Sequence, residues 1–469
     1  MENESNAEES ETKKSRHWIL WYSLMLAIAV GVFFAIRSIG ESTLDSPLGE
    51  PADFGTLRRY VPPKSLPRLL GALAAILITG RVLGAIFQRI GQPRVIGEVV
   101  AGILLGPSLL GRISPEVMWS LFPELISVQL NVIAQLGVIL FMFLVGLELN
   151  AELLHGRVST TVVISHAGIV APFVMGAALA LWLFPQLAPR GVPFTSFALF
   201  LGVSLSVTAF PVLARILTER GLQHSELGVL ALSCAAAGDV TAWCLLAFVV
   251  GVAQSAVAGA ITTALLTMVF IGVMFGVVRP LAQKWLCASD SAPLNGQSVA
   301  SVLLLMMLSS LAAEAIGIHA LFGAFLLGAV IPHDSAVARA LHEKLHDLVV
   351  ILLLPAFFAY SGLRTQIGLV SGLSEWLTCG AIIAVATVGK LGGTMIAARL
   401  TGIEWRTAGA LGVLMNTRGL MELIVLNIGL DLGVISPTLF AMMVLMALAT
   451  TIATTPILAL LNRTNPQRL

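Results

Sequence analysis

The sequence predicts an all-α polytopic membrane protein with about 14 transmembrane helices. Of its 469 residues, 57% are hydrophobic and only 11% are charged, whereas soluble proteins carry about 25% charged residues. The apolar runs are about 20 residues long, which suits helices that cross about 30 Å of hydrocarbon and not the alternating ten-residue strands of a barrel. Related strings also recur in the two halves of the chain, which predicts inverted repeats with two broken, crossing helices.

The N-terminal region predicts a tail, an anchor helix and a loop. Residues 1–16 are polar and rich in acids, so we expect a disordered cytoplasmic tail. Residues 17–38 form an apolar run that is long for a signal peptide and has no convincing small-residue cleavage site, which favours an uncleaved anchor helix. Residues 39–66 are polar and contain four prolines, and we expect them to form an extracytoplasmic loop.

Residues 67–461 form the predicted membrane domain. About thirteen apolar segments of membrane-spanning length follow one another in it. They are found at residues 67–90, 94–111, 130–150, 157–186, 192–218, 225–252, 257–284, 296–316, 318–334, 346–368, 375–400, 403–430 and 435–461. We expect repeat one at about 67–252, a linker helix at 257–284 and repeat two at about 296–461.

The distribution of positive charge predicts the orientation of the chain. With the anchor the spans number about fourteen, so both termini lie on the same side of the membrane. Most lysines and arginines then fall in the tails and in the loops on that side. Because cytoplasmic loops carry an excess of these residues, we expect both termini, including the short tail 462–469, to be cytoplasmic.

Three pairs of strings support an internal repeat. The members of each pair lie seven spans apart, and an odd offset makes the second copy enter the membrane from the opposite face, as in secondary transporters. The pairs are residues 101–106 with 323–328, 145–148 with 361–364, and 206–211 with 415–419.

The third pair predicts two broken helices. Pro211 has no N–H to donate to the carbonyl of Val207, and Gly419 is an equivalent weak point in the later span. Broken, polar helices at membrane depth are tolerated where they are buried or line a cavity, and freed carbonyls there can bind a cation. The expected crossover residues are Phe210, Pro211, Asn416, Thr417, Arg418 and Gly419.

Asp239 is the candidate site for ion and proton binding. It lies near the centre of a long apolar run, where a carboxylate costs about 2.5–3.5 kcal/mol on insertion scales and usually persists for function. Two other pairs of charges can neutralise each other as structural ion pairs, Arg418 with Glu422 at i,i+4 and Arg81 with Glu98 in neighbouring spans. Asp239 and Lys390 remain without such a local partner. A single carboxylate that takes either a proton or a cation, but not both, is the minimal exchanger.

Several motifs resemble those of the monovalent cation:proton antiporter-2 family, the Kef-type and sodium/proton exchanger group. They cover about residues 67–461 in order. The motifs are QPRVIGEVVAGILLGPSLLG (92–111), SVTAFPVLARIL (206–217), AAAGDVTAW (235–243), GIHALFGAFLLGAVIP (317–332), FFAYSGLRT (357–365) and MNTRGLMELIVLNIGLDLGVISPTLF (415–440).

The resemblance implies how such a protein is built and where it binds the ion. It implies a homodimer with a dimerisation domain and a mobile six-helix core that works by elevator-like alternating access. It also implies that Asp239 is the ion-binding aspartate, with Thr208 and neighbouring backbone at the first crossover, and that Lys390 is the family's core lysine. We therefore expect Asp239, Thr208 and Ser206 to bind the ion or the proton.

Gly238 departs from this family's pattern, because Asp, Asn or Gln usually precedes the ion-binding aspartate. Lys390 then lacks one acidic partner and could bind Asp239 directly until a cation displaces it. A single titrating acid makes one cation for one proton the simplest stoichiometry, so electroneutral exchange is the expectation. The choice among sodium, potassium and lithium is not fixed by any spacing in the sequence.

Two other functions also fit parts of the sequence. Residues 342–346, HEKLH, match the H-E-x-x-H pattern of a zinc protease, in which two imidazoles share one helix face. They fall in a charged loop, and His333 is the only nearby candidate for a third ligand. A cation channel would also use buried polar groups, but repeats and broken helices favour an exchanger. We expect no enzyme activity, no stable metal, no cofactor and no nucleic-acid partner; the partners are the cation, the proton and lipid.

Overall fold

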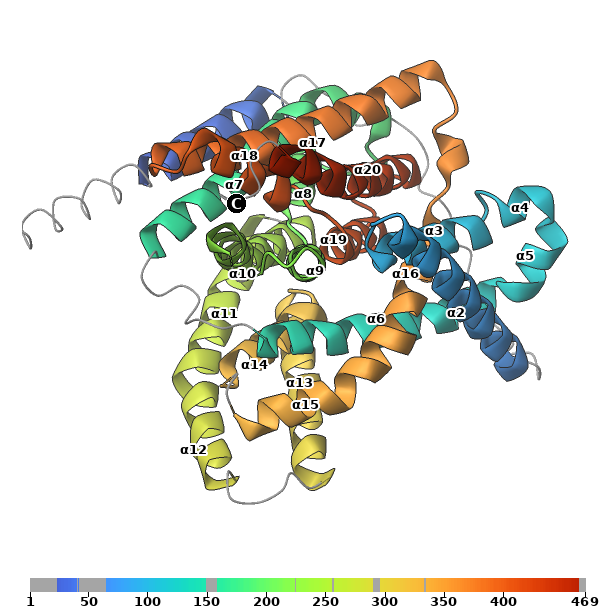
Figure 1. Cartoon of the computed structure of the whole chain (residues 1–469), viewed down its shortest axis with the longest axis horizontal. Coiled ribbons are helices and arrows are strands. Elements are labelled where there is room, and N and C mark those ends of the chain that lie inside the picture. The colour runs from blue at the N-terminus through green and yellow to red at the C-terminus, as the bar shows by residue number, and fades with distance from the viewer. Residues whose placement is uncertain are drawn as a thin grey trace, which may run out of the picture.

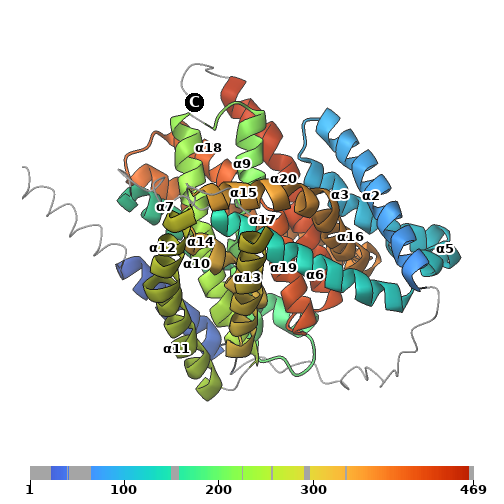
Figure 2. The same cartoon turned by 90° about the horizontal axis from the view of Figure 1, so that it is seen from below.

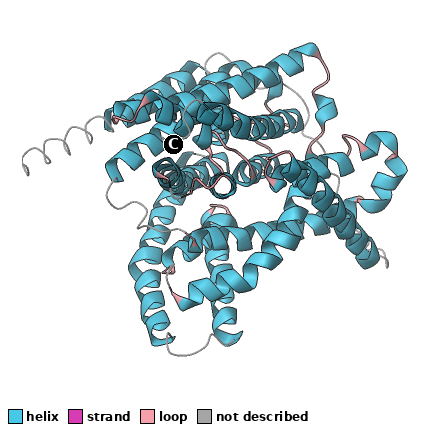
Figure 3. Ribbon diagram, viewed as in Figure 1, coloured by secondary structure: helices cyan, strands magenta, loops and turns pink. Residues whose placement is uncertain are grey.

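A computed structural model describes residues 23–39, 41, 65–148, 158–223, 225–254, 257–289, 296–332 and 335–463. Every regular element in these ranges is a helix (Figure 3). Eleven helices are long and apolar enough to cross a membrane, and the bent pair Trp405–Met415 and Leu420–Asp431 makes a twelfth span. Two shorter apolar helices, Ser23–Ile39 and Ala320–Val330, account for the other predicted spans. The predicted helical membrane bundle is therefore confirmed, whereas the tail 1–16, most of the loop 39–66 and the tail 464–469 lie outside the described residues.

The helices of the first half alternate between long spans and short connecting helices. They are α2 (Ser65–Arg89), α3 (Arg94–Leu105), α4 (Leu110–Ile113), α5 (Pro115–Leu121), α6 (Glu124–Leu147), α7 (Val158–Leu187), α8 (Phe194–Ser206), α9 (Phe210–Glu219) and α10 (Glu226–Gln254).

The helices of the second half begin at residue 257. They are α11 (Val257–Val273), the π-helical turn Met274–Val278, α12 (Arg279–Ser289), α13 (Gly296–Ile316), α14 (Ala320–Val330), α15 (Ala336–Leu348), the π-helical turn Val349–Leu353, α16 (Leu354–Arg364), the short 3₁₀ turn Ile367–Leu369, α17 (Leu373–Leu400), α18 (Trp405–Met415), α19 (Leu420–Asp431) and α20 (Pro437–Arg463).

The helices form two bundles. The crossing bundle consists of α7–α10 and α17–α20, in which α7 packs on α17, α8 and α10, and α20 packs on α17, α18 and α19. The flanking bundle consists of α2–α6 and α11–α16, in which α6 packs on α14 and α16, and α3 packs on α2 and α16. Figure 1 shows α17, α18 and α20 above α8–α10 and α19, with α6 and α11–α15 below. Seen from below, α11 and α12 lie near one edge of the molecule and α2 and α5 at the opposite edge (Figure 2).

Helices of the two proposed repeats pack on each other in the flanking bundle, α6 on α14 and α3 on α16. A Cβ atom on Gly146 of α6 would lie 2.2 Å from the carbonyl oxygen of Phe325 in α14, and a Cβ atom on Gly328 would lie 2.2 Å from that of Phe143. Helix α3 meets α16 in the same way, because a Cβ atom on Gly102 would lie 2.6 Å from Ala359 and one on Gly362 would lie 2.5 Å from Gly102. Small residues let membrane helices approach backbone to backbone. Each early string therefore packs against the later string of the other pair, 145–148 against 323–328 and 101–106 against 361–364.

We predict that Gly328→Ala lowers the stability of the folded protein, because its methyl group cannot enter the contact between α6 and α14 without moving backbone. Overpacking of this kind costs about 1–3 kcal/mol. Thermal unfolding in detergent, followed by tryptophan fluorescence, measures the effect. The control is Gly380→Ala on α17, where nothing lies within 4 Å of the added Cβ and alanine favours the helix. Equal melting temperatures for Gly328→Ala and the unmodified protein would show that this contact is not tight.

Candidate functional site

The two predicted helix breaks meet in the middle of the crossing bundle. Helix α8 ends at Ser206, Val207 is extended, and α9 begins at Phe210 with Pro211 in its first turn. Helix α18 ends at Met415, α19 begins at Leu420, and the pair is bent by 46°. The expected crossover residues therefore lie at or directly beside the two breaks.

Hydrogen bonds join the two breaks directly. The backbone N–H of Ala209 donates to the carbonyl of Thr417 at 3.0 Å. The hydroxyl of Thr208 donates to the carbonyl of Met415 at 3.3 Å. A Cβ atom on Gly419 would lie 2.9 Å from Val212 Cγ2 in α9, so the second break lies against the first turn of α9. Each break thus satisfies polar backbone groups that the other leaves open, as non-helical backbone at membrane depth requires.

Two buried cations bind the carbonyl end of α8. Arg418 Nη1 donates to Ser204 O at 3.1 Å, and its Nη2 donates to Leu205 O at 2.6 Å. Lys390 Nζ donates to Ser206 O. Both cations are 1% exposed. The last carbonyls of a helix have no partners within it and carry partial negative charge, so the broken end of α8 explains why two cations persist at this depth.

Arg418 also pairs with Glu422. Its Nη1 lies 2.7 Å from Glu422 Oε2, and both side chains are fully buried. The backbone N–H of Arg418 donates to Thr451 Oγ1 at 3.0 Å, and the Thr451 hydroxyl donates back to Arg418 O at 2.6 Å. Arg418 therefore connects α8, α19 and α20 at once, a contact that its i,i+4 spacing from Glu422 did not reveal.

Asp239 lies on α10 and is 3% exposed. Helix α10 packs against α8, α9 and α18, which brings Asp239 into the layer of the crossover. Its Oδ2 has no hydrogen-bond partner in the structure, and it interacts electrostatically with Lys390. Lys390 donates to Ser206 O, and the ion pairs between described residues do not join it to Asp239. One carboxylate oxygen of Asp239 is therefore free to accept a proton or a cation.

Other buried oxygens near the two breaks also lack hydrogen-bond partners. They are Ser204 Oγ, Asn416 Oδ1 and Thr417 Oγ1. Carboxylate, carbonyl and hydroxyl oxygens are the ligand type that hard cations prefer. By contrast, the Ser206 hydroxyl lies 2.9 Å from Ile169 O and 2.7 Å from Gly202 O. It is the carbonyl of Ser206, and not its hydroxyl, that reaches the charged centre.

Gly238 is closely packed against α7. A Cβ atom at this position would lie 3.0 Å from Ser165 Oγ, and the Ser165 hydroxyl donates to Cys234 O at 2.7 Å. The space that a larger side chain would need is therefore occupied by Ser165, which the sequence gave no reason to select.

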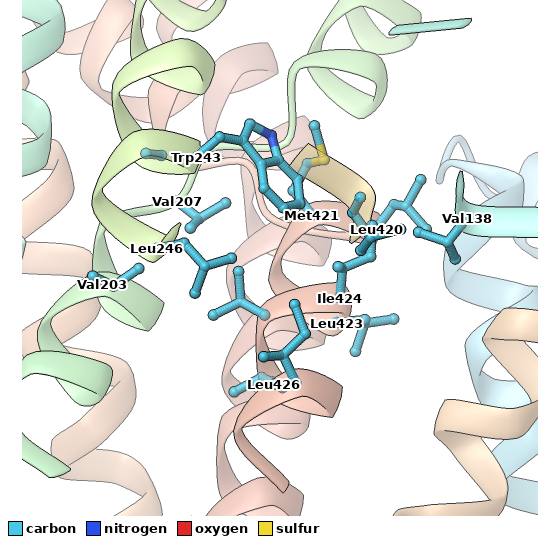
Figure 4. Close-up of a cluster of buried hydrophobic side chains, with 14 of the residues drawn as sticks. Val138, Val203, Val207, Trp243, Leu246, Leu420, Met421, Leu423, Ile424 and Leu426 are labelled. Atoms are coloured by element: carbon cyan, nitrogen blue, oxygen red, sulfur yellow. The ribbon is translucent and has the colours of Figure 1, made fainter. Parts of the chain in front are cut away.

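An apolar layer covers the crossover on the side of the flanking bundle. Figure 4 shows Trp243 of α10 beside Met421 of α19, with Leu420 and Ile424 between them and Val138 of α6. Val138 and Ile424 also line a cavity of about 510 Å³ between the two bundles. Asp239 itself is 3% exposed and is not among the residues that line this cavity.

The H-E-x-x-H residues do not form a metal centre. Helix α15 carries the motif, and the rings of His342 and His346 stack with centroids 4.8 Å apart. His342 Nδ1 lies 3.3 Å from Glu148 Oε1, and His346 Nδ1 lies 3.3 Å from Asp347 Oδ1. Among the described residues no group of three or more His, Cys, Asp and Glu could hold a metal ion, and His333 lies outside them. The zinc-protease alternative is therefore unsupported.

The second expected ion pair lies away from the crossover. Arg81 on α2 is exposed, and Glu98 on α3 is half-buried with its Cγ 3.7 Å from the position of a Cβ on Gly80. The pairing of Arg81 with Glu98 stays a prediction.

The fold matches that of a known transporter class. Residues 73–461 match the family model for the transmembrane sodium/hydrogen exchanger. A solved sodium proton antiporter, MjNhaP1 from Methanocaldococcus jannaschii, superimposes with a TM-score of 0.61 at 15% sequence identity, covering 84% of this chain and 96% of that one. The chain belongs to the sodium/hydrogen exchanger family.

Curated relatives are similar over the same region. The Na(+)/H(+) antiporter NhaS4 of Synechocystis sp. is 42% identical over 392 residues, which cover 83% of this chain and 96% of the relative. The K(+)/H(+) antiporter 1 of Saccharomyces cerevisiae is 35% identical over 392 residues, which cover 81% of this chain and 45% of the relative. The chain thus spans nearly all of the first relative and less than half of the second.

We predict that Arg418→Met destabilises the protein strongly, because it leaves Glu422 as a buried, unpaired charge. Removal of one partner of a buried pair costs about 3–5 kcal/mol. The double variant Arg418→Met/Glu422→Met removes that charge and is expected to melt at a higher temperature than Arg418→Met alone. Thermal unfolding in detergent compares the two. If the double variant is no more stable than Arg418→Met, the ion pair with Glu422 is not what Arg418 contributes, and its bonds to α8 account for the loss.

Proposed function

We propose that this protein is a secondary active transporter that exchanges a monovalent cation, sodium or potassium, for protons. Membership of the sodium/hydrogen exchanger family supports this activity. The relatives include a Na(+)/H(+) antiporter and a K(+)/H(+) antiporter, which is why we propose sodium or potassium as the cation. The observation that carries the proposal is the buried Asp239 beside two crossing helix breaks, with one carboxylate oxygen free. The comparisons give no support to a channel or a protease.

We assign the ion and proton competition to Asp239. A buried carboxylate is costly while it is charged and alone, so a proton or a cation must neutralise it. The free oxygens of Ser204, Asn416 and Thr417 are candidates to replace part of the hydration shell of the cation. Thr208 and Lys390 act on the site indirectly, Thr208 by joining the two breaks and Lys390 by its charge.

Alternating access supplies the transport step in this proposal. Asp239 is buried and does not line the cavity between the bundles, so in this proposal relative movement of the crossing and flanking bundles exposes it. We place both termini in the cytoplasm and the chain in the cell membrane, from the distribution of positive charge. The homodimer implied by the family resemblance stays a prediction.

We predict that Asp239→Asn abolishes exchange, because an amide cannot take up and release a proton or neutralise a bound cation. Purified protein in proteoliposomes with a quenched internal pH dye is given sodium, potassium or lithium, and the initial rate of dequenching is measured. Glu116→Gln, an exposed acid on α5, is the matched control and is expected to keep the unmodified rate. Cation-dependent dequenching by Asp239→Asn at the unmodified rate would remove Asp239 from the mechanism.

We predict electroneutral exchange. The residue before Asp239 is Gly238 and not a second acid, so one cation replaces one proton on a single carboxylate. Membrane potentials of either sign are imposed with valinomycin and a potassium gradient, and the pH is clamped. The initial exchange rate is then measured with lithium or sodium as the transported cation. Equal rates at both signs of potential are expected. A rate that follows the potential would mean that more than one proton moves for each cation.

A further inference from the structure

A polar contact joins the two bundles at the rim of the cavity between them. Arg364, at the end of α16, places Nη1 2.7 Å from Asp431 Oδ1 and 3.1 Å from Asn427 Oδ1, both on α19. Asn427 Nδ2 donates in turn to Ser361 Oγ on α16 at 2.7 Å. These four residues, here called the clasp, thus tie α16 of the flanking bundle to α19 of the crossing bundle through side chains alone.

The clasp lies at the edge of the cavity between the bundles. The cavity of about 510 Å³ is lined by α6, α13, α14 and α16 on one side and by α19 on the other, and Asn427 and Asp431 are among its lining residues. Permanent interfaces within proteins are as densely packed as crystals of small molecules. In the clasp, Ser361 and Asn427 are buried, whereas the side chains of Arg364 and Asp431 are 22% and 44% exposed beside the cavity. The exposed end of the clasp is therefore not the dense packing that holds a fixed interface in place.

Members of the clasp keep alternative partners if it opens. Asn427 Nδ2 also donates to Leu423 O on its own helix at 2.8 Å. The guanidinium carbon of Arg364 lies 5.3 Å from the ring centroid of Tyr360, one turn back on α16. Asp431 is 44% exposed, so water can replace Arg364 on its carboxylate. Ion pairs that water can reach contribute little net stability.

The other ion pair of α19 has the opposite character. Arg418 and Glu422 are both fully buried within the crossing bundle, and separation of such a pair leaves charges that nothing can compensate. Helix α19 therefore carries one pair that cannot separate at its buried start and one that can separate at its exposed end. Near this exposed end, Glu314 Oε2 of α13 accepts from Ala320 N at 2.9 Å, and His319 Nδ1 before α14 accepts from Leu321 N at 3.4 Å. His319 also interacts electrostatically with Asp431, whose ion-pair partner among the described residues is Arg364.

We propose that Ser361, Arg364, Asn427 and Asp431 form a reversible clasp that stabilises the present arrangement of the two bundles and must open once in every exchange cycle. The proposal rests on the exchange function proposed above. Opening lets α19 move away from α16 and widens the cavity toward the apolar layer at Met421.

A disulfide across the clasp tests this directly. The variant Ser361→Cys/Asn427→Cys is reconstituted in proteoliposomes, and exchange is measured before oxidation with copper phenanthroline, after it, and after reduction. We expect exchange in the reduced protein, at least a tenfold loss on cross-linking and recovery on reduction. The single variants Ser361→Cys and Asn427→Cys, treated alike, control for oxidation of the native cysteines. A fully cross-linked protein that exchanges at its reduced rate would overturn the proposal.

A labelling experiment tests the opening without relying on the disulfide or on transport. Ser361 is fully buried, so a cysteine there reacts with a soluble maleimide only when the clasp opens. We expect Ser361→Cys/Asp431→Asn to be labelled about tenfold faster than Ser361→Cys alone, and Ser309→Cys, buried against Gly323 O, to be labelled at the same rate with and without Asp431→Asn. Equal rates for the two Ser361→Cys proteins would overturn the clasp. If the unmodified protein shows no cation-dependent proton flux, the exchange function fails instead, whatever the labelling shows.

Discussion

The carbonyl end of α8 is the feature on which the site depends. Breaking a helix in the middle of a membrane leaves carbonyl groups that neither lipid nor water can satisfy. Here Lys390 from α17 and Arg418 from the break between α18 and α19 donate to three successive carbonyls, those of Ser204, Leu205 and Ser206. Residues from the second half of the chain thus bind the open end of a helix in the first half.

These two cations also determine which acids can exist nearby. Glu422 is bound to Arg418 at 2.7 Å and shares its complete burial, so it is committed to the framework. Each acid keeps one carboxylate oxygen without a hydrogen bond, Oδ2 of Asp239 and Oε1 of Glu422. The difference is the ion pair: Arg418 contacts Glu422, and the ion pairs between described residues include none to Asp239. This difference is why we propose Asp239, and not Glu422, as the acid available to a mobile cation or proton.

The bundles around this centre are built in two ways. Within the flanking bundle, glycines such as Gly146 and Gly328 bring helices into backbone contact, which fixes their positions. Between the bundles lie a cavity, an apolar layer at Trp243 and Met421, and the polar clasp of α16 and α19. Close contact inside a bundle and looser contact between bundles is the combination that a moving transporter requires.

The sequence alone determined the class of protein, because the length of an apolar run and the cost of charge at membrane depth act on each segment independently of its neighbours. For the same reason it identified Asp239, Pro211 and Gly419 as exceptional positions. The tertiary structure decided which group each charge meets: Lys390 donates to Ser206 O and also acts electrostatically on Asp239, Arg418 reaches α8, and Ser165 fills the space beside Gly238. Arg364 and Asp431 stand 67 positions apart in the sequence and meet only in the fold. Contacts of this kind depend on how helices distant in the chain are packed, and no local pattern of residues records that.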